Sequence, residues 1–186
     1  MPFLSVNGIS LHYHVSGNGT PILCIHPPLL TGENFNYQKA QLSDRYKIIT
    51  FDIRGHGASA PSKQTVTYPL IVEDMKSLLD ALNIEKAYLL GYSTGGSIAL
   101  EAMLTYPDRF VGSIIVSGMS EFRDFYNKFR LKLAAVLSNR FTKRLIAAAI
   151  TWGNSDMAYT RKKSVYECDA RFHSKYPGIL PIQLGL

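Results

Sequence analysis

The segment 86–100, KAYLLGYSTGGSIAL, decides the fold of this chain. It begins with a short apolar run, residues 87–90, of the kind that forms a buried strand. From residue 97 onward it continues as an apolar, helix-forming segment. Between strand and helix lies the glycine-rich sequence GYSTGG, residues 91–96, with Ser93 at its centre. This pattern predicts a sharp strand-to-helix turn, which we call the elbow.

A serine on so sharp a turn needs small residues two positions before and after it, because larger side chains would collide with the neighbouring strand and helix. Gly91 and Gly95 supply that clearance. The turn also aims the first free N–H groups of the helix, notably that of Thr94, at whatever bonds to Ser93. Ser93 is therefore predicted to be a nucleophile with half an oxyanion hole beside it. A plain glycine-rich turn is the alternative.

The composition indicates a globular protein. The chain has 186 residues, of which 46% are hydrophobic and 18% charged, and this length suits one domain with a sizeable core. No apolar run approaches the ~18 residues of a membrane span, and residues 1–10 do not resemble a signal peptide. A cytoplasmic protein is therefore predicted. Cys24 and Cys168 are expected to be unpaired thiols, and their spacing predicts no metal site.

The net charge of +6 is unevenly distributed. Residues 1–120 carry eight Lys or Arg and nine Asp or Glu, a net charge of −1, whereas residues 121–186 carry twelve and five, a net charge of +7. A basic segment is compatible with nucleic acid or an anionic membrane, but the short cluster Lys162-Lys163 matches no binding motif. We interpret it as a solvated helix face and expect no nucleic-acid partner.

Predicted strands and helices alternate along the first part of the chain. A hairpin is predicted at 3–15, because Asn7-Gly8 suits the positive φ angles of a type I′ turn. His12 and His14 share one face of its second strand, which we interpret as an ordinary solvated face. Further strands are predicted at 21–25, 46–51 and 111–117, with helices at 34–42, 69–82 and 97–106. This alternation predicts an α/β fold, a mostly parallel twisted sheet with helices on both faces.

The pattern changes after the last predicted strand. Phe122, Phe125 and Phe129 fall at helical spacing, and no further strand is convincing. We therefore divide the chain into a core, residues 1–118, and a helical region, residues 119–186. The aromatic stripe is interpreted as core packing, with the lining of an apolar substrate pocket as the alternative.

Three signatures follow one another along the chain: a loop that begins at His26 after a core strand, the loop 52–59 with the sequence DIRGHGAS, and the elbow at Ser93. Together they resemble the α/β-hydrolase superfamily, specifically its lipase, esterase and peroxidase-like branch. The resemblance covers residues 3–120. It implies the first six strands of that fold, with residues 119–186 as its helical cap.

The same resemblance implies roles for single residues. Ser93 matches the nucleophile of the family, and the N–H of Thr94 matches one oxyanion donor. The loop 52–59 matches a segment that is mainly structural in the family. His56, which lies in that loop, is therefore not expected to be the catalytic base.

The chain departs from the family pattern in the loop that begins at His26. Relatives usually carry His-Gly-x there, and the N–H of the residue after the glycine is the second oxyanion donor. Here that position is Pro28, which has no N–H. Either the N–H of Leu29 takes the role, or the oxyanion hole has a single backbone donor. Our hypothesis is that Leu29 substitutes.

A second departure concerns the partners of Ser93. The family supplies its acid after a seventh strand and its histidine after an eighth, so both are expected beyond Leu186. His173 completes a formal Ser, Asp, His order, but we interpret it as a cap or surface histidine. The apolar ending 177–186 suggests the N-terminal part of a longer hydrolase. The strand 111–117 is then expected to expose a sheet edge that favours self-association.

The predicted function is hydrolysis of a small, mostly apolar ester or similar acyl substrate through an acyl-enzyme on Ser93, with no cofactor. The serine disfavours dehalogenase and epoxide-hydrolase chemistry, because those relatives carry an aspartate at the same place. Carbon–carbon bond hydrolases, acyltransferases and cofactor-free peroxidases share the elbow and remain alternatives. A catalytically inactive binding or signalling protein is the alternative from a different class, favoured by Pro28 and by the missing histidine.

Overall fold

The computed structural model of the chain describes residues 2–118. Predictions that concern residues 119–186, among them the helical cap, its aromatic stripe and His173, lie outside the described residues. The elements in chain order are β1 (Phe3–Val6), β2 (Ile9–Ser16), β3 (Thr20–Ile25), the 3₁₀ helix η1 (Gly32–Phe35), α1 (Asn36–Leu42), β4 (Tyr46–Phe51), α2 (Tyr68–Ala81), β5 (Ala87–Tyr92), α3 (Thr94–Thr105) and β6 (Phe110–Val116). Among these elements, no helix has the length and apolar character needed to cross a membrane.

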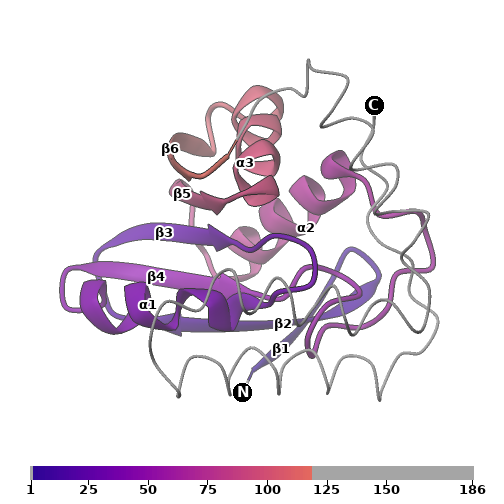
Figure 1. Cartoon of the computed structure of the whole chain (residues 1–186), viewed down its shortest axis with the longest axis horizontal. Coiled ribbons are helices and arrows are strands. Elements are labelled where there is room, and N and C mark those ends of the chain that lie inside the picture. Colours follow the sequence, from indigo (N-terminus) through magenta and orange to yellow (C-terminus); the bar gives the residue numbers. More distant parts are fainter. Residues whose placement is uncertain (1, 119–186) are drawn as a thin grey trace.

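The six strands form one mixed sheet in the order β1-β2-β4-β3-β5-β6 (Figure 1). The hairpin strands β1 and β2 pair antiparallel, and β2 pairs antiparallel with β4. From β4 to β6 every pairing is parallel. The mostly parallel sheet predicted from the sequence is therefore confirmed.

The Asn7-Gly8 turn fixes the register of the first two strands. Asn7 has φ +42° and Gly8 has φ +76°, the left-handed conformations that a type I′ turn needs. Val6 and Ile9 face each other directly across this turn. The predicted hairpin is present, with its turn at the expected residues.

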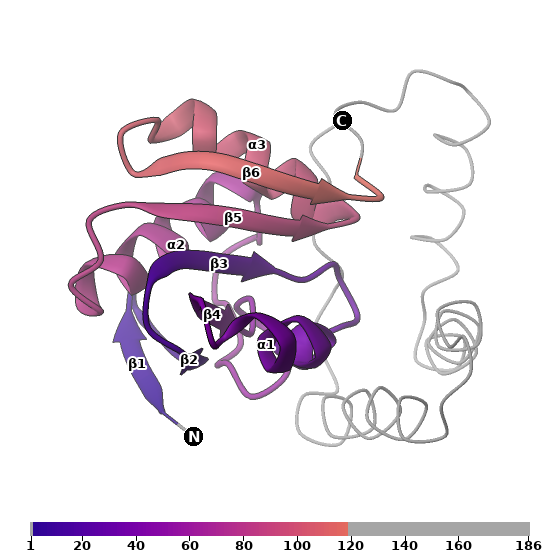
Figure 2. The ribbon, with the colours of Figure 1, turned by 90° about the vertical axis from the view of Figure 1, so that its left-hand side faces the viewer.

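Side chains alternate between the two faces of the sheet, and helices cover both faces. On one face Leu23 and Ile49 are fully buried in a cluster that includes residues of α2 and α3. On the other face Ile22 and Ile48 pack with Phe35, which lies just before α1. Figure 2 shows α1 on one side of the sheet and α2 and α3 on the other. The α/β fold predicted from the sequence is confirmed.

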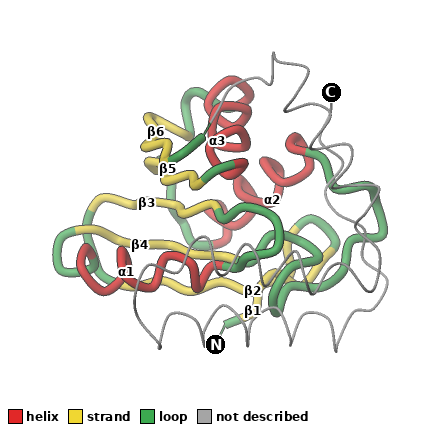
Figure 3. Tube along the Cα trace, in the orientation of Figure 1, coloured by secondary structure: helices red, strands yellow, loops and turns green. Residues whose placement is uncertain are grey.

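The loops that follow three neighbouring parallel strands lie together at the carboxyl ends of those strands. Residues 26–31 follow β3, residues 52–67 follow β4, and Ser93 follows β5. Figure 3 shows the loops after β3 and β4 extending beyond the same ends of the strands. In α/β sheets, ligands bind in the crevice outside the carboxyl ends of the strands. A functional site is therefore expected at these carboxyl ends of the strands.

β6 is the outermost strand on its side of the described sheet. The apolar side chains of Val111, Ile114, Ile115 and Val116 are between 39% and 56% exposed. An apolar strand with one unpaired edge is a surface to which another strand can add. The expected exposed edge is present in the described residues, and self-association through it stays a prediction.

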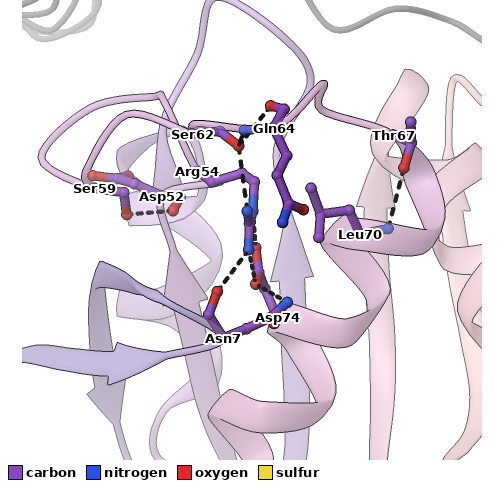
Figure 4. Close-up of polar contacts among 9 residues, drawn as sticks. All are labelled: Asn7, Asp52, Arg54, Ser59, Ser62, Gln64, Thr67, Leu70 and Asp74. Atoms are coloured by element: carbon purple, nitrogen blue, oxygen red, sulfur yellow. Dashed lines mark hydrogen bonds and ion pairs between the residues drawn. The ribbon is translucent and has the colours of Figure 1, made fainter.

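A buried ion pair ties the loop 52–67 to helix α2. The Arg54 guanidinium donates two hydrogen bonds to Asp74, from Nε to Oδ2 at 2.6 Å and from Nη2 to Oδ1 at 2.5 Å. Both side chains are at most 3% exposed. Asn7 Nδ2 also donates to Asp74 Oδ1 at 3.0 Å (Figure 4). One carboxylate therefore holds α2, the hairpin turn and the loop after β4 together.

We predict that Asp74→Ala lowers the free energy of unfolding by about 3–5 kcal/mol, because Arg54 is left buried without its counter-charge. Lys76→Ala removes the i,i+4 partner of Asp80 on the same helix, where both side chains are at least one-third exposed, and should cost about 1 kcal/mol or less. Urea unfolding followed by circular dichroism measures both values. Equal losses in the two variants would contradict the role assigned to the Arg54 ion pair.

Candidate active site

Ser93 lies at the tip of a sharp turn between β5 and α3. Its backbone has φ +55° and ψ −121°, an unusual conformation for a residue other than glycine. The Ser93 N–H donates to the Val116 carbonyl at 2.9 Å, and the Ser93 carbonyl accepts from the Gly96 N–H at 2.9 Å. Two backbone hydrogen bonds therefore hold Ser93 in a strained conformation, and such strain is concentrated at functional sites.

Close backbone contacts require glycine on both sides of Ser93. A Cβ atom on Gly91 would lie 2.5 Å from the Gly95 carbonyl oxygen. A Cβ atom on Gly95 would lie 2.1 Å from the carbonyl oxygen of Ile25, the last residue of β3. Neither distance leaves room for a side chain, which is the physical reason for the glycine spacing noted in the sequence. The second contact also sets the elbow against the residue that precedes His26.

The chain that leaves β6 passes close to the elbow. Ser117 has φ +51° and directs the chain into Gly118. A Cβ atom on Gly118 would lie 2.3 Å from Ile115 Cγ2 and 3.3 Å from the Ser93 carbonyl oxygen. A Cβ atom on Gly96 would meet the same Ile115 methyl group at 2.7 Å. Two glycines therefore let the chain after β6 pack on the backbone of the elbow.

The loop after β3 contains a tight turn over residues 27–30. The Leu30 N–H donates to the Pro27 carbonyl at 3.3 Å, and Leu29 has φ +68°. Pro28, at the second position of the turn, is held by its ring at a φ of about −65°. A negative φ at the second position and a positive φ at the third define a type II turn. Leucine thus occupies a position that usually takes glycine.

Only two residues of the turn 27–30, Leu29 and Leu30, have a backbone N–H. The two prolines have none, and the Leu30 N–H closes the turn. The Gly32 N–H donates to Asp52 Oδ1 at 2.8 Å. Within the described part of the chain, no hydrogen bond engages the Leu29 N–H. That group is available to a ligand.

The carboxylate of Asp52 is the centre of a buried hydrogen-bond network. Its Oδ1 accepts from the Gly32 N–H at 2.8 Å, and its Oδ2 accepts from the Ala58 N–H at 2.9 Å and from His12 Nδ1 at 2.8 Å. Burial alone raises the pKa of Asp52, but the hydrogen bond from His12, the nearby His26 and the two N–H donors outweigh it and hold the pKa below its usual value. Asp52 is therefore an ionised group fixed by donors from three segments.

The contact between His12 and Asp52 corrects one sequence-based interpretation. We interpreted His12 as part of a solvated strand face, yet its side chain is only 15% exposed. Its backbone N–H also donates to Ser59 Oγ at 2.9 Å, and Ser59 Oγ donates to the Asp52 carbonyl at 2.5 Å. The reason is the antiparallel pairing of β2 with β4, which brings together residues 40 positions apart. No local pattern reveals such a pair.

His26 is fixed as a neutral tautomer at the start of the loop after β3. It is fully buried, its Nδ1 donates to the Pro27 carbonyl at 2.8 Å, and its Nε2 accepts from the Ile53 N–H at 2.9 Å. Burial lowers the pKa of His26, with Asp52 and the Pro27 carbonyl acting in the opposite direction. Because backbone groups occupy both ring nitrogens, His26 cannot take a proton from a serine.

His56 lies beside His26, with the two ring centroids 5.4 Å apart. Its Nδ1 donates to the Arg54 carbonyl at 3.2 Å. Burial, followed by the neighbouring His26, lowers the pKa of His56 to about 4. Both rings are therefore uncharged near neutral pH.

Thr94 opens α3 directly after Ser93. Its N–H belongs to the first turn of the helix, whose N–H groups have no partner inside the helix. Its Oγ1 is buried and has no hydrogen-bond partner in the described structure. A backbone donor at a helix N-terminus beside a serine is suited to stabilise an oxyanion.

The residues singled out from the sequence fall in two adjoining segments. The elbow carries Gly91, Ser93, Thr94 and Gly95, and the loop after β3 carries His26, Pro28 and Leu29. The contact of Gly95 with the end of β3 brings the two segments together. In the part of the chain that the structure describes, no group of three or more His, Cys, Asp or Glu is placed to hold a metal ion.

Sequence comparison identifies relatives among known hydrolases. A profile of the family described as "alpha/beta hydrolase fold" matches residues 20–173. An epoxide hydrolase of Caballeronia sordidicola is 39% identical over 110 residues, which make up 58% of this chain and 33% of that protein. A putative carbamate hydrolase of Caulobacter vibrioides is 31% identical over 117 residues, which make up 59% of this chain and 43% of that protein. The chain thus spans less than half the length of these curated relatives.

Solved structures show the same architecture. A thermophilic esterase from Thermogutta terrifontis superposes with a TM-score of 0.73 at 25% identity, covering 81% of this chain and 58% of that chain. An esterase from Exiguobacterium antarcticum superposes with a TM-score of 0.78 at 19% identity, covering 90% of this chain and 67% of that chain. The second likeness is one of fold alone.

The buried neutral histidines predict a loss of stability in acid. The pKa values of His26 and His56 in the folded chain lie below the ordinary value of 6.5. Between pH 6.5 and about 4 the unfolded chain therefore binds protons that the folded chain excludes, so the free energy of unfolding falls as the pH falls. His56 alone accounts for about 3 kcal/mol over this range.

Urea unfolding at pH 7, 6, 5 and 4.5 measures this loss. Asp52 adds a slope of the same sign only as the pH approaches the usual aspartate pKa of 3.8, because its pKa in the folded chain lies below that value. His56→Gln carries a side chain that does not titrate. The free energy of unfolding of this variant should therefore fall less steeply with falling pH, by the slope that corresponds to about one bound proton. A stability that does not change between pH 7 and 4.5 in the parent protein would show that these histidines are not buried neutral.

Proposed function

Because this chain belongs to the α/β hydrolase fold family, we propose that it carries the nucleophile and the oxyanion donors of a serine hydrolase. The elbow is the observation that carries the proposal, since it presents Ser93 at positive φ between β5 and the N-terminus of α3. The epoxide hydrolase and the putative carbamate hydrolase among the relatives, and the esterase from Thermogutta terrifontis, support hydrolysis as the reaction class.

In the proposed reaction, Ser93 Oγ attacks the carbonyl carbon of an acyl substrate while a histidine takes the hydroxyl proton. The resulting oxyanion collapses, the bond to the leaving alcohol breaks, and the alcohol departs with that proton. Water then attacks the acyl-enzyme in the same way and releases the carboxylic acid. We propose that this histidine and its acid partner lie beyond Leu186, as the resemblance to the family implies. His26 is not the base, because backbone groups occupy both of its ring nitrogens.

The proposed oxyanion donors are the N–H groups of Thr94 and Leu29. Thr94 contributes from the N-terminus of α3, where the helix dipole also favours negative charge. In the loop after β3, the prolines have no N–H, and the Leu30 and Gly32 N–H groups are engaged by the protein. Leu29 is therefore the residue of this turn that we assign as the second donor.

The proposed substrate is a small, mostly apolar ester or a similar acyl compound, and no cofactor takes part. A serine at the elbow favours acyl transfer over epoxide opening, for which related enzymes use an aspartate. The second candidate function is that of a non-catalytic binding or signalling protein. The consecutive prolines at 27 and 28 favour it, because they remove two N–H groups from the loop that should stabilise an oxyanion.

We predict that a fluorophosphonate probe labels Ser93 in the full natural protein, because the proposed mechanism makes this hydroxyl nucleophilic. Ser93→Ala should abolish labelling and lower hydrolysis of p-nitrophenyl butyrate more than ~1,000-fold. Ser113→Ala is the matched control and should label normally, because it removes a serine that is only partly buried and whose buried Oγ has no partner in the described structure. Mass spectrometry of the labelled protein identifies the site. A parent protein that is folded but neither labelled nor active would favour the binding protein.

We further predict that Pro28→Gly leaves kcat about the same, because the second donor is the N–H of Leu29 and not that of residue 28. Steady-state kinetics with the same ester measures the effect. A rise in kcat of ~100-fold would show instead that the parent lacks a second donor and that the new N–H at position 28 supplies it.

A further inference from the structure

We propose that His26 and Asp52 are positioning residues that hold the turn 27–30 in its type II form and thereby set the direction of the Leu29 N–H. The proposal rests on the proposed function, in which that N–H is an oxyanion donor. In this scheme neither side chain touches the reacting atoms. Each acts through the backbone of the turn.

The turn adopts a form that leucine does not favour. In a type I turn the third residue has a φ of about −90°, which suits leucine, whereas the type II form requires a positive φ with steric strain at Cβ. The two forms differ by a rotation of about 180° of the peptide plane between the second and third residues, here Pro28 and Leu29. That rotation would carry the Leu29 N–H to the opposite side. Because Leu29 is observed at φ +68°, contacts outside the turn must hold it.

The first of these contacts is made by His26. Its Nε2 accepts from the Ile53 N–H at 2.9 Å, which ties the ring to the start of the loop after β4. Its Nδ1 donates to the Pro27 carbonyl at 2.8 Å. That carbonyl is the group that closes the turn by accepting from the Leu30 N–H. The imidazole therefore bridges the first peptide of the turn and the loop after β4.

The second contact fixes the far end of the loop. Asp52 Oδ1 accepts from the Gly32 N–H at 2.8 Å. A Cβ atom on Gly32 would lie 3.2 Å from the Phe51 carbonyl oxygen, so the loop backbone lies against β4. Gly57 closes the other side, where a Cβ atom would lie 2.2 Å from Asp52 Oδ2 and 2.9 Å from Thr31 Cγ2. The carboxylate is enclosed and cannot follow a movement of the turn.

Both ends of the loop are thus tied to consecutive residues, Asp52 and Ile53, while the strained Leu29 lies between them. Losing either tie lets Leu29 return to negative φ, and its N–H then turns away. An oxyanion donor acts in the transition state and not on the bound substrate. The expected signature is therefore a fall in kcat with little change in KM.

The first test is steady-state kinetics of the full natural protein with p-nitrophenyl butyrate. His26→Phe keeps a buried aromatic ring and removes both hydrogen bonds, and it should lower kcat ~100-fold with KM nearly unchanged. The matched control is His14→Phe, which makes the same substitution at a histidine of β2 whose side chain contacts Ser16. It should leave both constants within about twofold. A KM that rises while kcat is unchanged in the His26 variant would overturn the proposal.

The second test is a double-mutant cycle with Leu29→Gly. Glycine adopts the positive φ of a type II turn without strain, so the turn no longer needs its ties. In the Leu29→Gly background, His26→Phe should lower kcat less than about fivefold. A loss of ~100-fold in both backgrounds would overturn the proposal, because a purely structural role of His26 does not depend on residue 29.

A variant that leaves the buried network intact covers the case in which His26→Phe does not fold. Leu29→Val introduces a β-branched residue, which resists positive φ more than leucine does, and should lower kcat about tenfold. Unchanged kcat in this variant would overturn the proposal. Asp52→Asn then replaces His26→Phe in the double-mutant cycle.

A readout independent of activity separates this proposal from the proposed function. In a crystal structure of the His26→Phe or Asp52→Asn variant, we expect Leu29 at negative φ. A φ that stays near +68° would overturn the positioning role whatever the kinetics. Leu29 at negative φ together with a parent protein that shows no Ser93-dependent hydrolysis would support the positioning of the turn and overturn the hydrolase.

Discussion

The arrangement of the candidate site depends on the hydrogen bonds of the buried Asp52 carboxylate. A charge removed from water is costly unless donors surround it, and His12, Gly32 and Ala58 supply those donors. They come from β2, from the first residue of η1 and from the loop after β4. One charge thus joins segments that are far apart in the sequence. The position of the loop that carries Leu29 therefore depends on β2 and on the loop after β4 as well as on its own residues.

Most of the fold could be predicted because its signals are local. The Asn7-Gly8 turn, the apolar runs of the strands and the helical spacing of α2 each involve neighbours along the chain, and the structure places these elements as expected. The helix predicted at 34–42 differs in its first turn, which is the 3₁₀ helix Gly32–Phe35. There the chain lies against β4 through Gly32, a tertiary contact that periodicity does not report.

The candidate site could be predicted only in part, for the same physical reason. A contact with Gly95 requires Gly91, and a contact with Ile25 of β3 requires Gly95. The elbow is still visible in the sequence, because both glycines lie two positions from Ser93. The missing N–H of Pro28 is visible as well. The partner of His12 lies 40 positions away and that of Arg54 lies 20 positions away, so neither pair leaves a local pattern. The positive φ of Leu29 contradicts the preference of its own side chain and follows from tertiary contacts.

The packing beside the elbow has an evolutionary consequence. Gly96, Gly118 and the methyl group of Ile115 share one small space next to the Ser93 carbonyl. A larger residue at 96 or 118 fits only if the side chain at 115 moves to another rotamer or becomes smaller, so substitutions at these three positions are coupled. Homologous sequences that keep this geometry should change them in concert.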